Sequence, residues 1–290
     1  MSVLVGIGSP GTGSPGIGKV PGWLSTAHHW WGDNGLLLHV REHLVYTLIA
    51  VALALLIAVP LGLLIGHTGR GVALIAGLAN GLRAVPTLGF VVLLVVWISP
   101  KIHATGAVPG IVARGGLPYV VPVLIVLILL AIPPILTSTY AGVHNVDSAA
   151  RDAARGMGMT GWQVVRKVEF PCALPLIMSG LRSATLQVIA TATVAAYAPF
   201  LGGLGRLIID GAQQLNDPEA GYPAMVSAGI VVAVLAVLAD LSLIALQRVV
   251  VSPGLATRKH RRAVSARLTK VADKDRGPSL QVALNDRGEP

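Results

Sequence analysis

The sequence predicts an all-α integral membrane protein: a polytopic helical bundle of about five transmembrane helices, or six if one apolar stretch divides, with a short helix on the cytoplasmic side. Hydrophobic residues make up 53% of the 290 residues and charged residues only 12%, against about 25% charged in an ordinary soluble domain. The mean hydropathy is +0.72. The apolar residues also gather in stretches long enough to cross a ~30 Å hydrocarbon core.

Residues 1–40 precede the first apolar stretch and are expected to form a disordered extracytoplasmic segment, because Gly, Ser and Pro dominate most of it. Its run Gly13–Lys19 matches most of a phosphate-binding loop. Val20, however, stands where that loop needs a hydroxyl for Mg²⁺, and Pro21 follows where a helix should begin. We therefore expect this chain to bind no ATP. The run His28–Trp31 is typical of an interfacial anchor, since tryptophan favours the membrane surface.

The apolar stretches are expected to span the membrane at about residues 44–66, 72–99, 119–140, 176–200 and 224–246. Pro60 lies inside the first span, where a membrane helix tolerates proline. Asn80, Arg83 and Pro86 interrupt the second stretch, which is either one kinked span or two shorter pieces. Residues 41–250 thus form the predicted transmembrane domain.

The distribution of basic residues predicts the orientation. With the N-terminus outside, 15 of the 22 Lys and Arg residues fall inside and five outside, and Arg83 and Arg182 lie within spans. Because cytoplasmic loops carry the excess of positive charge, residues 144–175 and the C-terminus are expected to face the cytoplasm. The protein is thus predicted to be a multi-pass protein of the cell (inner or plasma) membrane.

The net charge of +9 comes mostly from the end of the chain, since ten of the 22 basic residues lie from Arg248 onward. Residues 251–290 are therefore predicted to be a basic cytoplasmic tail near anionic lipid, and no nucleic-acid partner is expected. Cys172 is the only cysteine, which excludes a disulfide framework and a thiol metal cluster. We expect no metal, no cofactor and no catalytic residues.

The loop 144–175 is predicted to hold two short helices. Asp147 is a good N-cap for the helix-forming run that follows it. Gly156 and Gly158 are expected to end that helix. A capping box over Thr160–Gln163 starts a second helix, and Pro171 is expected to stop it.

This loop offers a compact surface rather than a reaction centre. Small side chains allow close approach to another protein, and charged ones can fix its orientation, so docking is the natural interpretation. Because no catalytic set of His, Asp or Ser accompanies it, the chain is not expected to be an enzyme. The residues expected to couple the chain to a partner are Ala149, Asp152, Ala153, Ala154, Arg155, Gly156, Gly158 and Pro171.

The same loop resembles the cytoplasmic signature of binding-protein-dependent ABC importer permeases: Glu-Ala-Ala, three residues, Gly, nine residues, then Ile-x-Leu-Pro. Here Asp152-Ala153-Ala154, Gly158 and Val168-Glu169-Phe170-Pro171 stand at that spacing. The resemblance implies a coupling helix that fits a groove of a separate ATPase subunit. Asp in place of Glu keeps the acid but shortens it.

The likeness runs from about residue 42 to 250, and some segments resemble the osmoprotectant branch of that family. That branch comprises permeases for glycine betaine, carnitine or choline. The chain departs from the branch before its Gly-Gly-Leu-Gly run, where it has Ala198-Pro199-Phe200-Leu201. The segments that carry the likeness are residues 84–88, 139–143, 154–160 and 202–205.

The resemblance implies an ABC ATPase subunit, a second permease chain of the same or another kind and an extracytoplasmic substrate-binding protein as partners. We place the translocation path at Arg83, Pro86, Gly202, Gly203 and Gly205. Arg83 and Arg182 either line that path or reach toward the membrane surface, and Asp240 either pairs with a neighbour or lies in a polar cavity. The alternatives are a permease for another small solute such as methionine, and a secondary carrier.

Overall fold

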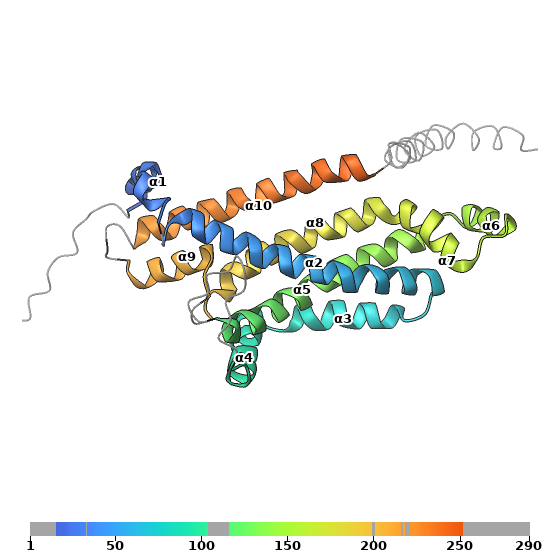
Figure 1. The fold of residues 1–290 in the computed structure, drawn as a ribbon, viewed down its shortest axis with the longest axis horizontal. Helices are drawn as coiled ribbons and strands as arrows, with labels where there is room; N and C mark the ends of the chain where they lie inside the picture. The colour runs from blue at the N-terminus through green and yellow to red at the C-terminus, as the bar shows by residue number, and fades with distance from the viewer. Residues whose placement is uncertain are drawn as a thin grey trace, which may run out of the picture.

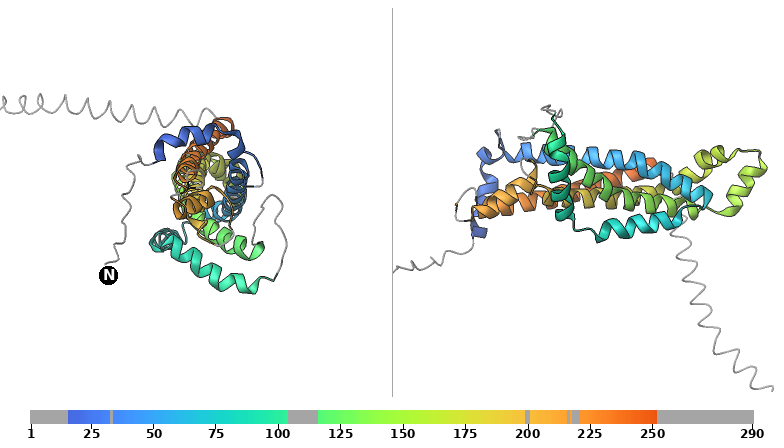
Figure 2. Two further views of the ribbon diagram at one scale, coloured as in Figure 1. Left: turned by 90° about the vertical axis from the view of Figure 1, so that its left-hand side faces the viewer. Right: turned by 90° about the horizontal axis from the view of Figure 1, so that it is seen from below.

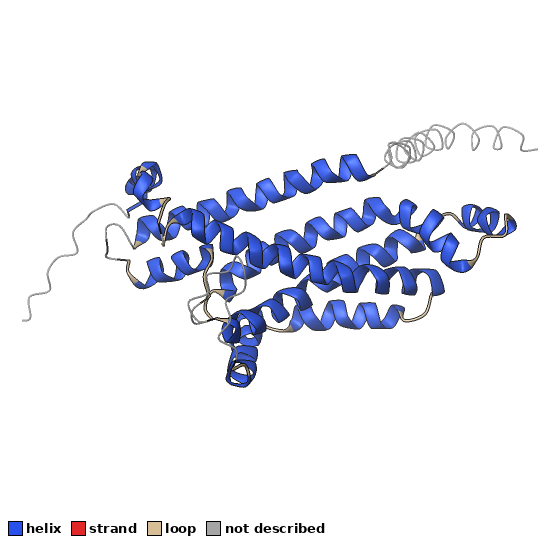
Figure 3. Ribbon diagram, in the orientation of Figure 1, coloured by secondary structure: helices blue, strands red, loops and turns tan. Residues whose placement is uncertain are grey.

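The computed structural model describes residues 16–32, 34–103, 116–198, 201–215, 217 and 221–251. Within these residues all the regular secondary structure is helical, as the sequence predicted (Figure 3). Four long helices lie lengthwise along the molecule (Figure 1). They are α2 (Leu36–Thr68), α5 (Leu117–His144), α8 (Phe170–Ala195) and α10 (Tyr222–Val250).

These four helices correspond to four of the predicted spans, and each is long and apolar enough to cross a membrane. Each also extends beyond the predicted apolar stretch at one end or both. The largest extension precedes α8, because α7 (Gly161–Val164) and a π turn (Val165–Glu169) join it into one continuous helix over Gly161–Ala195. The chain is therefore a polytopic membrane protein with an all-α fold.

The second predicted span is divided at Pro86. Helix α3 (Val72–Ala84) ends before it, and α4 (Thr87–Ile98) begins after it and runs in a different direction (Figures 1 and 2). Proline lacks an N–H and forces the preceding residue out of the helical region, and Val85 has an extended backbone (φ −77°, ψ 125°). Neither half reaches the roughly 20 residues of a span, so the described residues hold four helices long enough to span a membrane, where the sequence predicted five or six.

The N-terminal segment departs from the expected disorder. Residues 16–29 form two short 3₁₀ helices, Gly16–Lys19 and Ala27–His29, on either side of α1 (Val20–Ser25). Trp23 is buried in a small apolar cluster with Leu36, Leu204 and Ala224. The buried Trp23 gives this segment apolar contacts with the bundle, which its Gly-rich composition did not predict. Helix α2 then begins at Leu36, eight residues before the predicted span.

Helix α9 (Leu204–Gln213) was not predicted, because the Gly-rich connection around it was interpreted as a loop. It packs against α10 beside α1, at one end of the bundle. The opposite end carries α6 (Ser148–Gly156) and α7 (Figure 1). We call these the α9 end and the α6 end.

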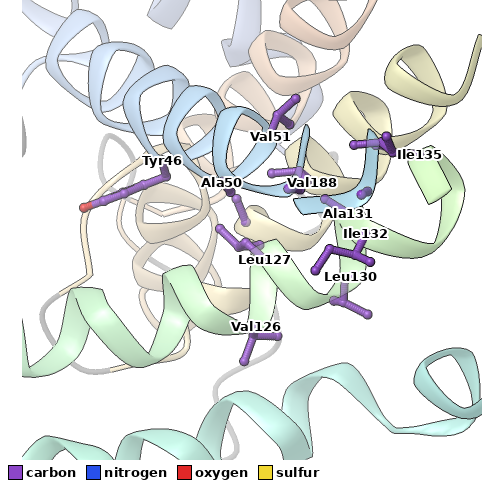
Figure 4. Close-up of a cluster of buried hydrophobic side chains, with 14 of the residues drawn as sticks. Tyr46, Ala50, Val51, Val126, Leu127, Leu130, Ala131, Ile132, Ile135 and Val188 are labelled. Carbon is purple, nitrogen blue, oxygen red and sulfur yellow. The ribbon is translucent and has the colours of Figure 1, made fainter. Parts of the chain in front are cut away.

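The core lies where α2, α5 and α8 meet. Tyr46, Ala50, Leu127, Ala131 and Val188 are among the buried side chains that fill it (Figure 4). Helix α10 packs more loosely, because its most apolar stretch has no buried residue in the single chain.

Glycines let the three central helices approach closely. A Cβ built on Gly62 or Gly66 of α2 would lie 2.6 Å from the Cβ of Thr139 or Val143 of α5. Gly180 of α8 is equally tight, since its Cβ would lie 2.5 Å from the Cβ of Ser138. Close packing at small residues is how helices associate in lipid, where the hydrophobic effect offers little drive.

We expect Gly180→Ala to destabilise the bundle by about 1–3 kcal/mol, the usual cost of overpacking a core. The added methyl would also lie 2.7 Å from the carbonyl oxygen of Pro134, a backbone atom with little freedom to move. Gly229 of α10 is the control, because a Cβ there meets nothing within 4 Å. Gly229→Ala should be neutral or slightly stabilising, since Ala is the better helix former. Thermal unfolding in detergent measures both, and an equal shift in the two variants would contradict this packing.

Candidate functional site

The loop between α5 and α8 is built as its sequence predicted. Asp147 caps α6, with its side chain accepting a hydrogen bond of 3.1 Å from the N–H of Ala149. Gly158 follows α6 with φ +77°, a left-handed conformation that favours glycine. Thr160 then starts α7 with a capping box in which the Gln163 side chain accepts from the Thr160 N–H at 2.8 Å. The two short helices thus project from the α6 end of the bundle (Figure 1).

Most of the residues expected to couple the chain to a partner lie on the surface of this loop. Asp152 and Arg155 form an exposed ion pair at 3.6 Å, and Gly158 meets no atom that would obstruct a side chain within the chain itself. The exposed members of the expected set are Ala149, Asp152, Ala153, Arg155, Gly156 and Gly158.

Two of the expected coupling residues lie elsewhere. Ala154 is only 1% exposed, so it packs inside the loop and offers no surface to a partner. Pro171 lies in the first turn of α8, at the base of the loop, and is half-buried. The expected stop at Pro171 is therefore wrong.

The physical reason is the π turn Val165–Glu169 that precedes Pro171. Proline in a helix lacks an N–H and its ring clashes with the carbonyl four residues earlier. A π turn changes the backbone spacing just before the proline, which lets the helix continue past it.

Sequence reasoning missed two large apolar side chains on this loop. Met157 and Trp162 are 71% and 70% exposed, on either side of Gly158. Both side chains therefore leave large apolar area exposed on an otherwise polar loop. The signal was present in the sequence, since both residues stand in the most polar segment between two spans.

A buried carboxylate lies at the base of the loop. Glu169 is 0% exposed, and its Oε2 accepts a hydrogen bond of 2.9 Å from Nδ1 of His67, in the last turn of α2. Its Oε1 lies 2.9 Å from Nε of Arg151 of α6, an ion-pair contact in which the N–H is not aligned for a hydrogen bond. The contact between Glu169 and His67 was not predicted, because 102 positions separate the two residues.

A second buried carboxylate lies at the α9 end. Glu42 of α2 is 2% exposed, and its Oε2 accepts a hydrogen bond of 2.7 Å from the N–H of Gly203. His39 Nδ1 lies 3.5 Å from the same oxygen. His43 Nε2 and the carbonyl oxygen of Ile189 in α8 are 3.0 Å apart. The turn between α8 and α9 is thereby joined to α2.

The glycines of that turn were expected to line the translocation path, and the structure places them in tight contacts. A Cβ on Gly202 would lie 2.0 Å from Oε2 of Glu42, and one on Gly205 would lie 2.2 Å from the carbonyl oxygen of Thr193. Gly203 has φ +89°. Pro86, by contrast, is exposed at the junction of α3 and α4, which is a different part of the chain from the turn between α8 and α9. The side chain of Arg83 lies outside what the structure describes.

Arg182 and Asp240 form an ion pair between α8 and α10. Two parallel contacts of 2.7 and 2.9 Å join the guanidinium to the two carboxylate oxygens. Paired charge is the expected state of ionisable groups within a membrane. Of the alternatives left open for Asp240, the structure supports pairing with a neighbour.

The structure describes only part of the phosphate-loop-like run. Residues 13–15 lie outside the described residues, and the rest of the run, Gly16–Lys19, is a 3₁₀ helix. In the described part of the chain, no group of three or more His, Cys, Asp or Glu side chains could hold a metal ion.

The structure is thus a bundle of helices long enough to span a membrane, with a protruding two-helix loop at one end. Residues 58–251 match the family described as "Binding-protein-dependent transport system inner membrane component". The match covers more than half of the chain, and the chain belongs to this family. It is therefore a multi-pass transport permease of the cell membrane.

The chain is similar to several characterised permeases. It is 33% identical over 220 residues to the glycine betaine/carnitine/choline transport system permease protein OpuCB of Bacillus subtilis, which covers 76% of this chain and 90% of the relative. It is 34% identical over 181 residues to the carnitine transport permease protein OpuCB of Listeria monocytogenes, covering 62% and 74%. It is 29% identical over 233 residues to the osmoprotectant import permease protein OsmW of Salmonella typhimurium, covering 80% and 100%.

Solved structures share the fold. A chain of the inward-facing MetNI methionine ABC transporter superposes with a TM-score of 0.60 at 19% identity, covering 77% of this chain and 100% of that one. An amino acid ABC transporter determined with histidines gives a TM-score of 0.51 at 18% identity, covering 74% and 91%. At these identities the likeness concerns the fold alone.

We expect Glu42→Leu to loosen the turn between α8 and α9, because the buried N–H of Gly203 would lose its acceptor at a cost of about 1–3 kcal/mol. Hydrogen–deuterium exchange around Gly203 should become faster. Glu42→Gln is the matched control, since its amide oxygen can still accept from that N–H, and it should exchange more slowly than the Leu variant. Equal exchange in the two variants would contradict the role of this hydrogen bond.

Proposed function

We propose that this chain is the membrane-spanning subunit of an ABC importer that takes up osmoprotectants such as glycine betaine, carnitine or choline. The energy comes from a separate ATPase subunit, and this chain itself hydrolyses no ATP. The observation that carries the proposal is the protruding segment from α6 to the start of α8, whose residues have the spacing of the importer signature. The osmoprotectant substrates rest on relatives of about 30% identity whose names record those solutes.

The loop is suited to docking on an ATPase. Ala149 and Ala153 are exposed and small, so another protein can approach the backbone of α6 closely. Met157 and Trp162 add apolar area, and a buried aromatic anchor often dominates the energy of an interface. The exposed pair of Asp152 and Arg155 supplies charge that can fix the orientation.

The distribution of charge supports an orientation with the α6 end in the cytoplasm. Among the described residues, Arg151, Arg155, Arg166 and Lys167 all belong to α6 and the π turn. Residues 1–40 then face outside, and the tail 251–290, of which only Val251 is described, faces the cytoplasm. An ATPase in the cytoplasm can reach the loop only in this orientation.

In this proposal a second permease chain completes the pore. It is either another copy of this chain or a related chain. The exposed apolar side chains of α10 support it, because a single bundle leaves them to lipid or to another protein. They include Ile230, Val234, Val237, Leu238 and Leu241. Two chains in a roughly two-fold arrangement can enclose a path between them.

Transport then proceeds by alternating access. ATP binding draws two ATPase subunits together, the docked loops follow, and the bundles rock so that the path opens to the other side. An extracytoplasmic binding protein supplies the selectivity. A secondary carrier would need no docking loop, and methionine is not favoured by a structural likeness of 19% identity.

The substrate class is tested by uptake into proteoliposomes that hold the chain with the ATPase and binding protein of its own system. We expect ATP-dependent uptake of labelled glycine betaine, carnitine or choline, and no uptake of methionine. Liposomes without ATP are the control. Methionine uptake, or osmoprotectant uptake driven by an ion gradient alone, would refute the proposal.

The docking role of the loop is tested by Gly158→Asp. The left-handed backbone at Gly158 disfavours other residues, and an unpaired charge buried against a partner costs several kcal/mol. We expect normal membrane insertion but loss of ATPase co-purification and of uptake, at least about tenfold. Ala153→Glu should have a milder effect of the same kind.

The matched control for this test is Asn145→Asp, which adds the same charge at the exposed end of α5, outside α6 and α7. It should keep ATPase binding and uptake. If Gly158→Asp also keeps both, the loop is not the docking element.

A further inference from the structure

Glu169 connects parts of the chain that are distant in sequence. Its carboxylate lies between Arg151 of α6 and His67 of α2, each at 2.9 Å. Glu169 itself ends the π turn that leads into α8. One buried side chain therefore contacts α2 and α6 and belongs to the helix that continues into α8.

Arg151 extends this connection to the fourth element. Its Nη2 donates a hydrogen bond to the carbonyl oxygen of Val143, in the last turn of α5. The ends of α2 and α5 also touch directly, because Gly66 packs against Val143. All three central spans thus meet at the foot of the loop, around the ion pair.

The ion pair is well suited to hold this junction. The Glu169 side chain is 1% exposed and that of Arg151 is 20% exposed. A carboxylate buried so fully is stable only beside compensating charge, and removing its partner is costly. The arginine, by contrast, keeps some access to water. Neutralising Glu169 should therefore weaken the junction without unfolding the bundle.

We infer that Glu169 is a positioning residue that makes α6 and the ends of α2, α5 and α8 move together when a partner displaces the loop. This inference rests on the proposed function and deepens it. The exposed face of α6 receives the displacement from the ATPase, and Arg151, on the same helix, passes it to Glu169. Without that ion pair, α6 could shift on its short connections, residues 145–147 and 157–160, while the spans stay still.

The test is Glu169→Gln, which keeps the size of the side chain and removes its charge. We expect co-purification with the ATPase and ATP hydrolysis to persist, while glycine betaine taken up per ATP hydrolysed falls about tenfold, within the range typical of coupling between sites. Arg151→Met should give the same loss. The double variant Arg151→Met/Glu169→Gln should lose no more than either single variant, since non-additivity marks two residues that act as a pair.

Lys167→Gln is the matched control, because it removes an exposed charge from the same π turn. Its uptake per ATP should equal that of the parent chain. A ratio for Glu169→Gln within about twofold of this control would overturn the inference, and so would additive losses in the double variant.

The test also separates this inference from the proposed function. If Glu169→Gln alone abolishes ATPase co-purification, Glu169 shapes the docking surface rather than passing on its movement, and the inference fails while the proposed function stands. If the parent chain binds no ATPase, both fail. Hydrogen–deuterium exchange at the end of α2 adds a readout free of any partner, and faster exchange is expected in Glu169→Gln than in Lys167→Gln.

Discussion

The close approach of α2, α5 and α8 is the constraint on which the rest of this structure depends. In lipid, apolar side chains gain little by leaving their surroundings, so helices associate through packing at small residues. Gly62, Gly66 and Gly180 remove the side chains that would hold the three helices apart. The loop α6–α7 and the turn before α9 are both connected to this three-helix unit, at its opposite ends. The three helices therefore pack as one unit between the two ends.

Polar groups within the bundle are arranged to suit the same solvent. Glu42, Glu169 and the pair Arg182–Asp240 each find a partner from another element. A buried charge without a partner would be costly. The two buried glutamates lie at opposite ends of the bundle. Glu42 is joined to the turn before α9, and Glu169 is joined to α6. Each joins an irregular part of the chain to the regular bundle.

Much of this fold could be predicted from local sequence. Four of the five predicted apolar stretches correspond to long helices, and the caps at Asp147 and Thr160 lie where their residue types indicated, because capping involves residues two or three positions apart. Pro86 was rightly singled out as an interruption. The predictions that failed depended on tertiary contacts. Trp23 orders a segment whose composition suggested disorder, and no local pattern shows that Ala154 faces inward.

The candidate site was predictable in outline only. The spacing of Asp152, Gly158 and Pro171 identified the loop, yet its exposed apolar residues and its connection to α2 through His67 were not found. A pairing across about 100 positions leaves no periodic trace in a single sequence. The expected end of the helix at Pro171 failed for a related reason, since a π turn has no strong signature in residue types.

That π turn has a consequence for how the family spacing should be understood. A π turn amounts to one residue inserted into an α-helix, and each residue turns an α-helix by about 100°. Three of the five residues of the π turn, 165–167, lie among the nine residues between Gly158 and Val168. A chain shorter by one residue there would rotate the loop α6–α7 relative to α8 by about a quarter-turn or more, with every residue of the loop intact. The length of this segment is thus as much a part of the proposed docking element as the residues that it carries.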